Sequence, residues 1–123
     1  MLRKPRRNRP EAILTTHYFR WLGYAYPRAF KVAHHIPNEG KRSVIEGALL
    51  KQQGLKKGTP DICIPIANES HHSLYLEVKI KPNKPTKEQK EMISLLEAEG
   101  NRCEVCYTLD ELIGVTTDYM EKI

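Results

Sequence analysis

The chain has 123 residues, of which 40% are hydrophobic, and carries a formal net charge of +5. These values describe one small globular domain, and no apolar run approaches the roughly 20 residues that a membrane helix needs. The basic N-terminus lacks the apolar stretch of a signal peptide, and three cysteines do not suggest a secreted disulfide framework, so we expect a cytoplasmic protein without a membrane partner.

The N-terminal segment 1–9 is predicted to be a basic arm, separate from a single domain over 10–123. It is short of apolar residues and is expected to be disordered alone, either lying along a phosphate backbone or remaining in solvent. Its cationic side chains are Arg3, Lys4, Arg6, Arg7 and Arg9.

Helical spacing of apolar residues predicts the first helix over 10–22, with Gly23 as its stop. A strand is expected over 31–36, where one of His34 and His35 would face the core. The other histidine would face solvent or the active cleft, as a candidate substrate contact. Ser43-xx-Glu46 is a capping box that predicts a second helix, which ends at Gly54.

A hairpin is predicted from two segments, 61–66 and 74–80, in which every second residue is aliphatic. Antiparallel pairing of Ile66 with Leu74, Ile64 with Leu76 and Ile62 with Val78 places these six side chains on one buried face. Asp61, Glu77 and Lys79 then share the opposite face.

Two further capping boxes, Thr86-xx-Gln89 and Thr108-xx-Glu111, predict the last two helices. The third helix would turn its apolar residues Met92, Ile93, Leu95 and Leu96 inward and end at Gly100.

Between these two helices, a strand is expected over 102–107. Cys103 and Cys106 would point to opposite faces of this strand, so we expect buried core cysteines rather than a zinc site.

Two carboxylates and a lysine on one face of a hairpin fit metal-dependent phosphodiester hydrolysis. A divalent cation offsets the negative charge that builds up on the phosphate and supplies an activated water. Asp61, Glu77 and the carbonyl of Val78 would be ligands of Mg²⁺ or Mn²⁺, and Lys79 would orient the water or stabilise the transition state. The alternative is a charged stripe on a half-exposed hairpin.

At these residues the chain resembles the VRR-NUC family of the PD-(D/E)xK nuclease superfamily. The resemblance spans roughly residues 10 to 115 and rests on Glu11, the stretch 34–40, Gly58 to Asp61, Glu77-Val-Lys79 and Thr86-xx-Gln89. It implies an α/β, restriction-endonuclease-like core with a mixed central sheet flanked by helices. It also implies a metal-dependent nuclease that leaves 5′-phosphate products, and suggests a phage-encoded protein acting in the cytoplasm of a bacterial host.

The resemblance further implies that Glu11 and Gln89 complete the site. Each has an alternative explanation: Glu11 as a first-turn carboxylate favoured by the helix dipole, and Gln89 as half of a capping box. Both roles of Gln89 can hold at once.

The positive charge indicates a polyanionic partner, which we expect to be DNA. Because no base-reading module is evident, DNA shape is the expected target, with branched DNA such as a Holliday junction as substrate and a homodimer supplying two active sites. The alternative is a basic nucleic-acid-binding protein without catalysis. The expected DNA contacts are Arg42, Lys56, Lys57, Lys81 and Lys84.

Overall fold

The computed structural model describes residues 9–37 and 43–123. Arg42 and all of the basic arm except Arg9 therefore lie outside the described residues, as does part of the 34–40 stretch. The elements are α1 (Arg9–Ala25), α2 (Pro27–Val32), β1 (His34–His35), α3 (Val44–Gln52), β2 (Ile62–Ile64), β3 (Leu74–Val78), α4 (Lys87–Ala98), β4 (Arg102–Cys106) and α5 (Leu109–Met120).

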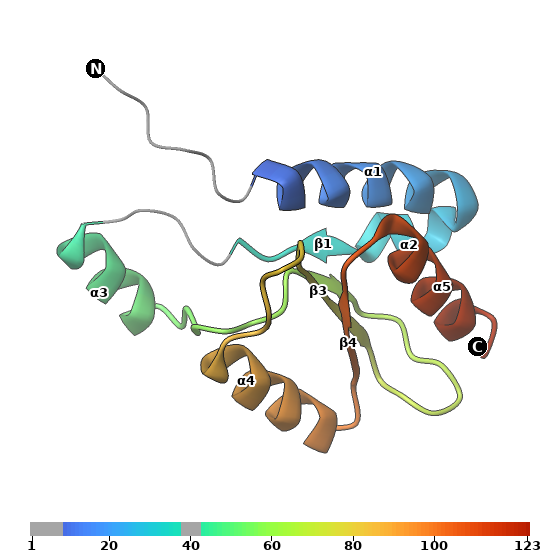
Figure 1. Cartoon of the computed structure of the whole chain (residues 1–123). Helices are drawn as coiled ribbons and strands as arrows, with labels where there is room; N and C mark the ends of the chain where they lie inside the picture. The colour runs from blue at the N-terminus through green and yellow to red at the C-terminus, as the bar shows by residue number, and fades with distance from the viewer. Residues whose placement is uncertain (1–8, 38–42) are drawn as a thin grey trace.

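The four strands form one mixed sheet in the order β1-β2-β3-β4. β1, β2 and β3 pair antiparallel, whereas β3 and β4 are parallel and are connected through α4. One face of the sheet carries α1, α2 and α5, and α4 covers the other (Figure 1). The α/β, restriction-endonuclease-like architecture with flanking helices is confirmed.

The hairpin forms, but its predicted register is wrong by two residues. Ile64 pairs with Leu74 and Ile62 with Leu76, whereas Ile66 lies beyond the strand. Pro65 follows Ile64 and has no N–H to continue the ladder, so β2 ends there. A slip of two residues preserves the side-chain faces, and all six aliphatic residues are buried as predicted.

The segment after the first helix also differs from the prediction. α1 continues through Gly23 to Ala25, because Gly23 packs beneath the ring of Phe30, which would lie 3.3 Å from an added Cβ. Pro27 then starts α2, so Lys31 and Val32 are helical and only His34 and His35 form a strand. Both histidines are exposed, so neither faces the core.

The capping residues predict the other helices well. Reciprocal capping boxes begin α3 at Ser43 and α4 at Thr86, and Gly54 and Gly100 follow these helices with positive φ. Thr108 caps α5, but the carboxylate of Glu111 accepts from the N–H of Tyr107 and not from that of Thr108, so the predicted capping box is only half formed. Leu95 was expected to face inward and is 64% exposed.

The core lies between the sheet and the helices α1, α2 and α5. At its centre the hydroxyls of Tyr18 and Thr116 are 2.6 Å apart, so these buried polar groups are paired. Cys103 and Cys106 are buried, as expected. No helix in the described ranges is long and apolar enough to cross a membrane.

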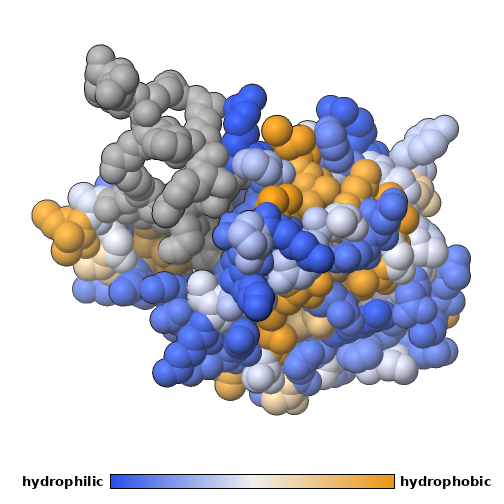
Figure 2. Space-filling model, viewed as in Figure 1, coloured by the Kyte–Doolittle hydropathy of each residue, from blue (hydrophilic) through white to orange (hydrophobic). Residues whose placement is uncertain are grey.

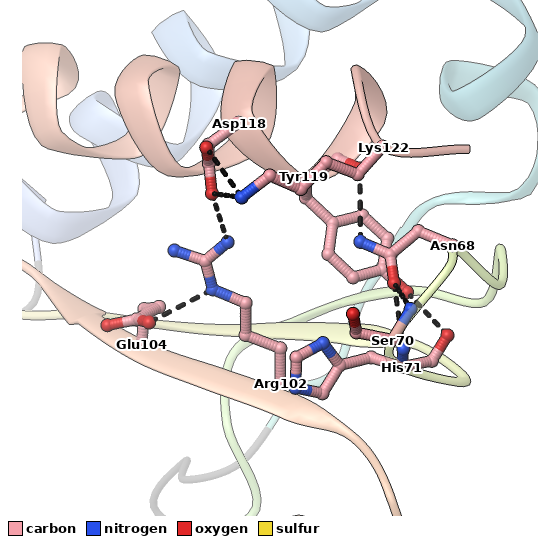
Figure 3. A network of polar contacts seen from close by, with 8 residues as sticks. All are labelled: Asn68, Ser70, His71, Arg102, Glu104, Asp118, Tyr119 and Lys122. Atoms are coloured by element: carbon pink, nitrogen blue, oxygen red, sulfur yellow. Dashed lines mark hydrogen bonds and ion pairs between the residues drawn. The ribbon is translucent and has the colours of Figure 1, made fainter.

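A polar network fixes α5 to the edge strand β4 and to the loop before β3 (Figure 3). Arg102 on β4 donates to Glu104 at 3.0 Å and to Asp118 at 2.7 Å, while the Tyr119 hydroxyl donates to the carbonyl of Ile66 at 2.6 Å. These contacts fix the end of the sheet where β3 and β4 begin, since Arg102 pairs with Leu74. The opposite end, where β3 finishes at Val78, is the open end.

Candidate active site

An open cleft of about 880 Å³ lies at the end of the sheet where β3 finishes and the segment before β2 arrives. The sheet contributes Asp61, Glu77 and Lys79. The other walls come from α1, the β1 segment and the start of α4, with Glu11 and Gln89 among their residues. Five residues that were predicted from separate parts of the sequence therefore line one cavity.

Asp61 reaches the cleft through a turn that glycine makes possible. Gly58 has a φ of +88°, and an added Cβ would lie 2.5 Å from the carbonyl oxygen of Glu88. The turn therefore packs directly on the N-terminus of α4. Asp61 Oδ2 accepts a 2.8 Å hydrogen bond from the N–H of Val78, which holds the carboxylate beside β3.

Glu77 is the most constrained residue of the cleft, being only 2% exposed. Its Oε2 accepts from the Gln89 amide at 2.9 Å, and its Oε1 is buried without a hydrogen-bond partner among the described residues. Burial, followed by repulsion from Asp61, raises the pKa of Glu77 to about 8. An orphaned, desolvated carboxylate oxygen is costly and is typical of a functional site.

Lys79 supplies a positive charge in the same cleft. Its Nζ lies 3.6 Å from Glu77 Oε2, and its side chain is 12% exposed. Because Glu77 and Lys79 are two positions apart, they project from the same side of the chain, as the sequence predicts.

Gln89 makes hydrogen bonds to both the start of α4 and the buried carboxylate. Its Oε1 accepts from the N–H of Thr86 at 2.8 Å and completes the capping box, while its Nε2 donates to Glu77. One side chain therefore fixes the start of α4 and orients the buried carboxylate.

Glu11 faces the cleft from the first turn of α1. Its pKa is raised, chiefly by burial and, against the lowering effect of Lys79, by the charge of Asp61. Asp61 likewise has a raised pKa, with burial as the main cause and the Val78 N–H opposing it. Three carboxylates thus repel one another around Lys79.

This set of groups fits a divalent cation. In the described ranges no three His, Cys, Asp or Glu side chains are arranged to hold a metal by themselves. The fit instead rests on two close carboxylates with an unpartnered buried oxygen, a donor set that suits Mg²⁺, which keeps several waters and takes few protein ligands.

The predicted cationic contacts are spread around the site. Lys84 lines the cleft itself, whereas Lys57 pairs with Glu88 at 3.9 Å and Lys81 lies over the ring of Tyr107. Lys56 is exposed before the Gly58 turn. His35 lines the cleft, although the sequence did not indicate which of the two histidines would do so and neither faces the core.

Sequence reasoning did not identify the α1 wall of the cleft. Ala12, Thr15, Thr16 and Phe19 line it together with Glu11. Thr15 and Phe19 follow Glu11 at steps of four residues, and Thr16 lies four residues after Ala12, which is the helical spacing that could have identified them.

Comparisons with known proteins identify the family of the chain. The family model described as VRR-NUC domain matches residues 7–109. A solved structure named a VRR_NUC domain protein superposes with a TM-score of 0.81 at 29% identity, covering 98% of this chain and 93% of that one. No curated protein matches the chain. The chain belongs to the VRR-NUC domain family, a family of nucleases.

Proposed function

We propose that this protein is a Mg²⁺- or Mn²⁺-dependent DNA endonuclease that hydrolyses phosphodiester bonds in the cleft beside α1. The observation that carries the proposal is Glu77, a buried carboxylate with an unpartnered oxygen, held beside Asp61 and Lys79. A protein that only bound DNA would gain nothing from this arrangement, because burying like charges together destabilises the fold.

Asp61, Glu77 and the carbonyl of Val78 would hold the cation, with Glu11 as an outer ligand. When bound, the cation offsets negative charge on the phosphate and makes a water more acidic. The protein's own part is positioning: the Val78 N–H holds Asp61, and the Gln89 amide holds Glu77. The Lys79 ammonium donates to the attacking water or to the phosphate oxygens, whose charge grows in the transition state.

The cationic side chains around the cleft support DNA as the substrate. Lys84 lies within the cleft. Lys56 and Lys57 precede Asp61 in the chain, and Lys81 follows Lys79. Lysine contacts to phosphates give affinity without reading sequence and make binding strongly dependent on salt. We therefore propose recognition of DNA shape, with branched DNA, including four-way junctions, as the preferred substrate.

Cutting a four-way junction symmetrically requires two active sites, and a second copy of the chain would supply the second one. We propose a homodimer in which α3 supplies part of the contact. α3 stands away from the other elements in Figure 1, and Figure 2 shows hydrophobic surface over it. Val44 is 90% exposed, Ile45 is 73% exposed and Leu49 is 50% exposed. A nine-residue helix is marginal without tertiary packing, so a second copy would stabilise it.

The catalytic proposal is tested on a labelled panel of single-stranded, duplex, flapped and four-way-junction DNA in Mg²⁺, Mn²⁺ and EDTA. Wild type should cut in either metal and not in EDTA, with branched substrates cut fastest. Asp61→Asn should bind the same DNA and cut none of it. Glu97→Gln, an exposed carboxylate on α4, serves as the matched control and should behave as wild type. Binding without cutting under every condition would indicate the non-catalytic DNA-binding protein instead.

The dimer is tested by light scattering at low micromolar concentration. Wild type should have twice the chain mass, and Ile45→Glu should be a monomer. Leu95→Glu also places a charge on an exposed apolar position, but on α4, and should remain a dimer. A monomeric wild type with full junction-cutting activity would contradict the dimer.

A further inference from the structure

The cleft extends well past the carboxylates along one stripe of α1. Beyond Glu11 the wall consists of Ala12, Thr15, Thr16 and Phe19, none of which carries a charge. At 1.5 Å per residue the stripe from Glu11 to Phe19 is about 12 Å long. Since stacked nucleotides are about 3.4 Å apart along a strand, this wall is long enough to contact the nucleotides that adjoin the cut phosphate.

The hydrogen-bonding groups of this wall are acceptors. The hydroxyl of Thr15 donates to the carbonyl of Glu11 at 2.8 Å, and that of Thr16 donates to the carbonyl of Ala12 at 2.9 Å. Each hydroxyl hydrogen is therefore used within the helix, which leaves the lone pairs of the two oxygens to accept from a ligand. Such a wall cannot hold a phosphate, which needs donors, but it can accept from N–H groups.

Donors come instead from the sheet and from the segment between β3 and α4. Lys79, Asn83 and Lys84 all line the cleft there. A strand lying in the cleft would place its phosphates toward these side chains and its bases toward α1. The wall that carries donors thus suits the phosphate of a nucleotide, and the α1 wall suits its base.

We propose that the Thr15, Thr16 and Phe19 wall binds an unpaired nucleobase next to the cut phosphate, so that the enzyme acts where a DNA strand leaves the duplex. This inference rests on the nuclease function proposed above. The N–H donors on the Watson–Crick edge of a paired base are already engaged by its partner, whereas those of an unpaired base can donate to the threonine oxygens. Phe19 adds an aromatic surface, on which bases of any sequence can stack.

The test measures DNA binding in EDTA by fluorescence anisotropy, so that it needs no metal and no cutting. The variants are Thr16→Val, which replaces the hydroxyl by a methyl group, and Phe19→Leu, which keeps an apolar side chain but loses the ring. Thr117→Val on α5 and Tyr24→Leu on α1 are matched controls, because neither residue lines the cleft and Tyr24 is 92% exposed. The probes are a flapped DNA, the same DNA with an abasic nucleotide on either side of the junction, and a continuous duplex.

Phe19→Leu should weaken binding to the flapped DNA about tenfold, and Thr16→Val should weaken it by a smaller factor. An abasic nucleotide at the contacted position should weaken wild type similarly and remove the difference between wild type and variants. On continuous duplex, variants and controls should bind as wild type does. Equal losses on abasic and intact flaps, or no loss in either variant, would overturn the proposal.

The same samples separate this inference from the nuclease function. If wild type cuts in Mg²⁺ or Mn²⁺ but the variants bind intact and abasic flaps with the same affinity as wild type, the base contact is wrong and the nuclease proposal stands. If base-dependent binding is found but no metal supports cutting, the nuclease proposal fails while the base contact is retained.

Discussion

Replacing Glu77 by glutamine should stabilise the metal-free protein near neutral pH, although it removes the residue most central to the proposed chemistry. With its pKa raised from 4.5 to about 8, Glu77 holds its proton in the folded state at a pH where the unfolded chain has lost it. The folded state therefore binds more protons, and stability is lost as the pH rises from about 4.5 to about 8. Glutamine does not titrate, so its variant escapes this loss.

The magnitude follows from two opposing effects. Between pH 4.5 and pH 7 the free energy of unfolding of wild type falls by about 3 kcal/mol, since each pKa unit corresponds to about 1.4 kcal/mol. The glutamine Nε2 would take the place of the unpartnered Oε1, and an unpaired buried donor costs about 1 to 2 kcal/mol. The net gain at pH 7 is then about 1 to 2 kcal/mol, or several degrees in Tm for a domain of this size. Near pH 4.5 the gain disappears, and wild type should be equally or more stable.

The assay is chemical or thermal unfolding of both proteins in EDTA between pH 4.5 and 8. The stability of Glu77→Gln minus that of wild type should increase with pH and cross zero between these limits. Glu97→Gln, the exposed control on α4, should show no such trend. A difference that stays constant across the pH range would refute the reasoning that Glu77 is a buried carboxylate under charge repulsion.

Three other substitutions address the remaining parts of the site. Lys79→Met should reduce cutting at least a hundredfold while binding to flapped DNA in EDTA falls by less than about tenfold, as separate kinetic and anisotropy measurements would show. Gln89→Glu keeps the capping box but replaces the donor to Glu77 by a carboxylate, so circular dichroism should be unchanged while cutting is lost; retained cutting would mean that Gln89 serves only as a cap. Gly58→Ala should destabilise the protein by more than about 2 kcal/mol in urea unfolding, because of its positive φ and the 2.5 Å approach to Glu88; a neutral result would mean that the turn can move away from α4.

Alternation along the two strands was enough to predict that Asp61, Glu77 and Lys79 share one face of the hairpin. Asp61, Glu77 and Lys79 lie together because the aliphatic residues between them must face the core, and that requirement fixes the face of the hairpin on which each residue lies. It does not fix the register, since a two-residue slip buries the same six side chains. The end of β2 at Pro65 decides the register, and the hydrophobic pattern alone does not reveal it.

Other features depend on tertiary contacts that no local pattern reveals. Gly23 resembles a helix stop, but its missing side chain makes room for Phe30, and the helix continues. The short helix α2 begins at Pro27 and includes Lys31 and Val32, which the apolar pattern had assigned to a strand. The orphaned Oε1 of Glu77 and the second bond of Gln89 are visible only once α4 is packed against the sheet.

The central claim, that Asp61 and Glu77 form a metal site, is tested most directly by calorimetric titration of Mn²⁺ into wild type and Asp61→Asn without DNA. The account predicts saturable binding to wild type that is lost or weakened at least tenfold in the variant, with protons released as the raised-pKa carboxylates ionise. Equal titrations of the two proteins, or no saturable binding to wild type, would contradict it.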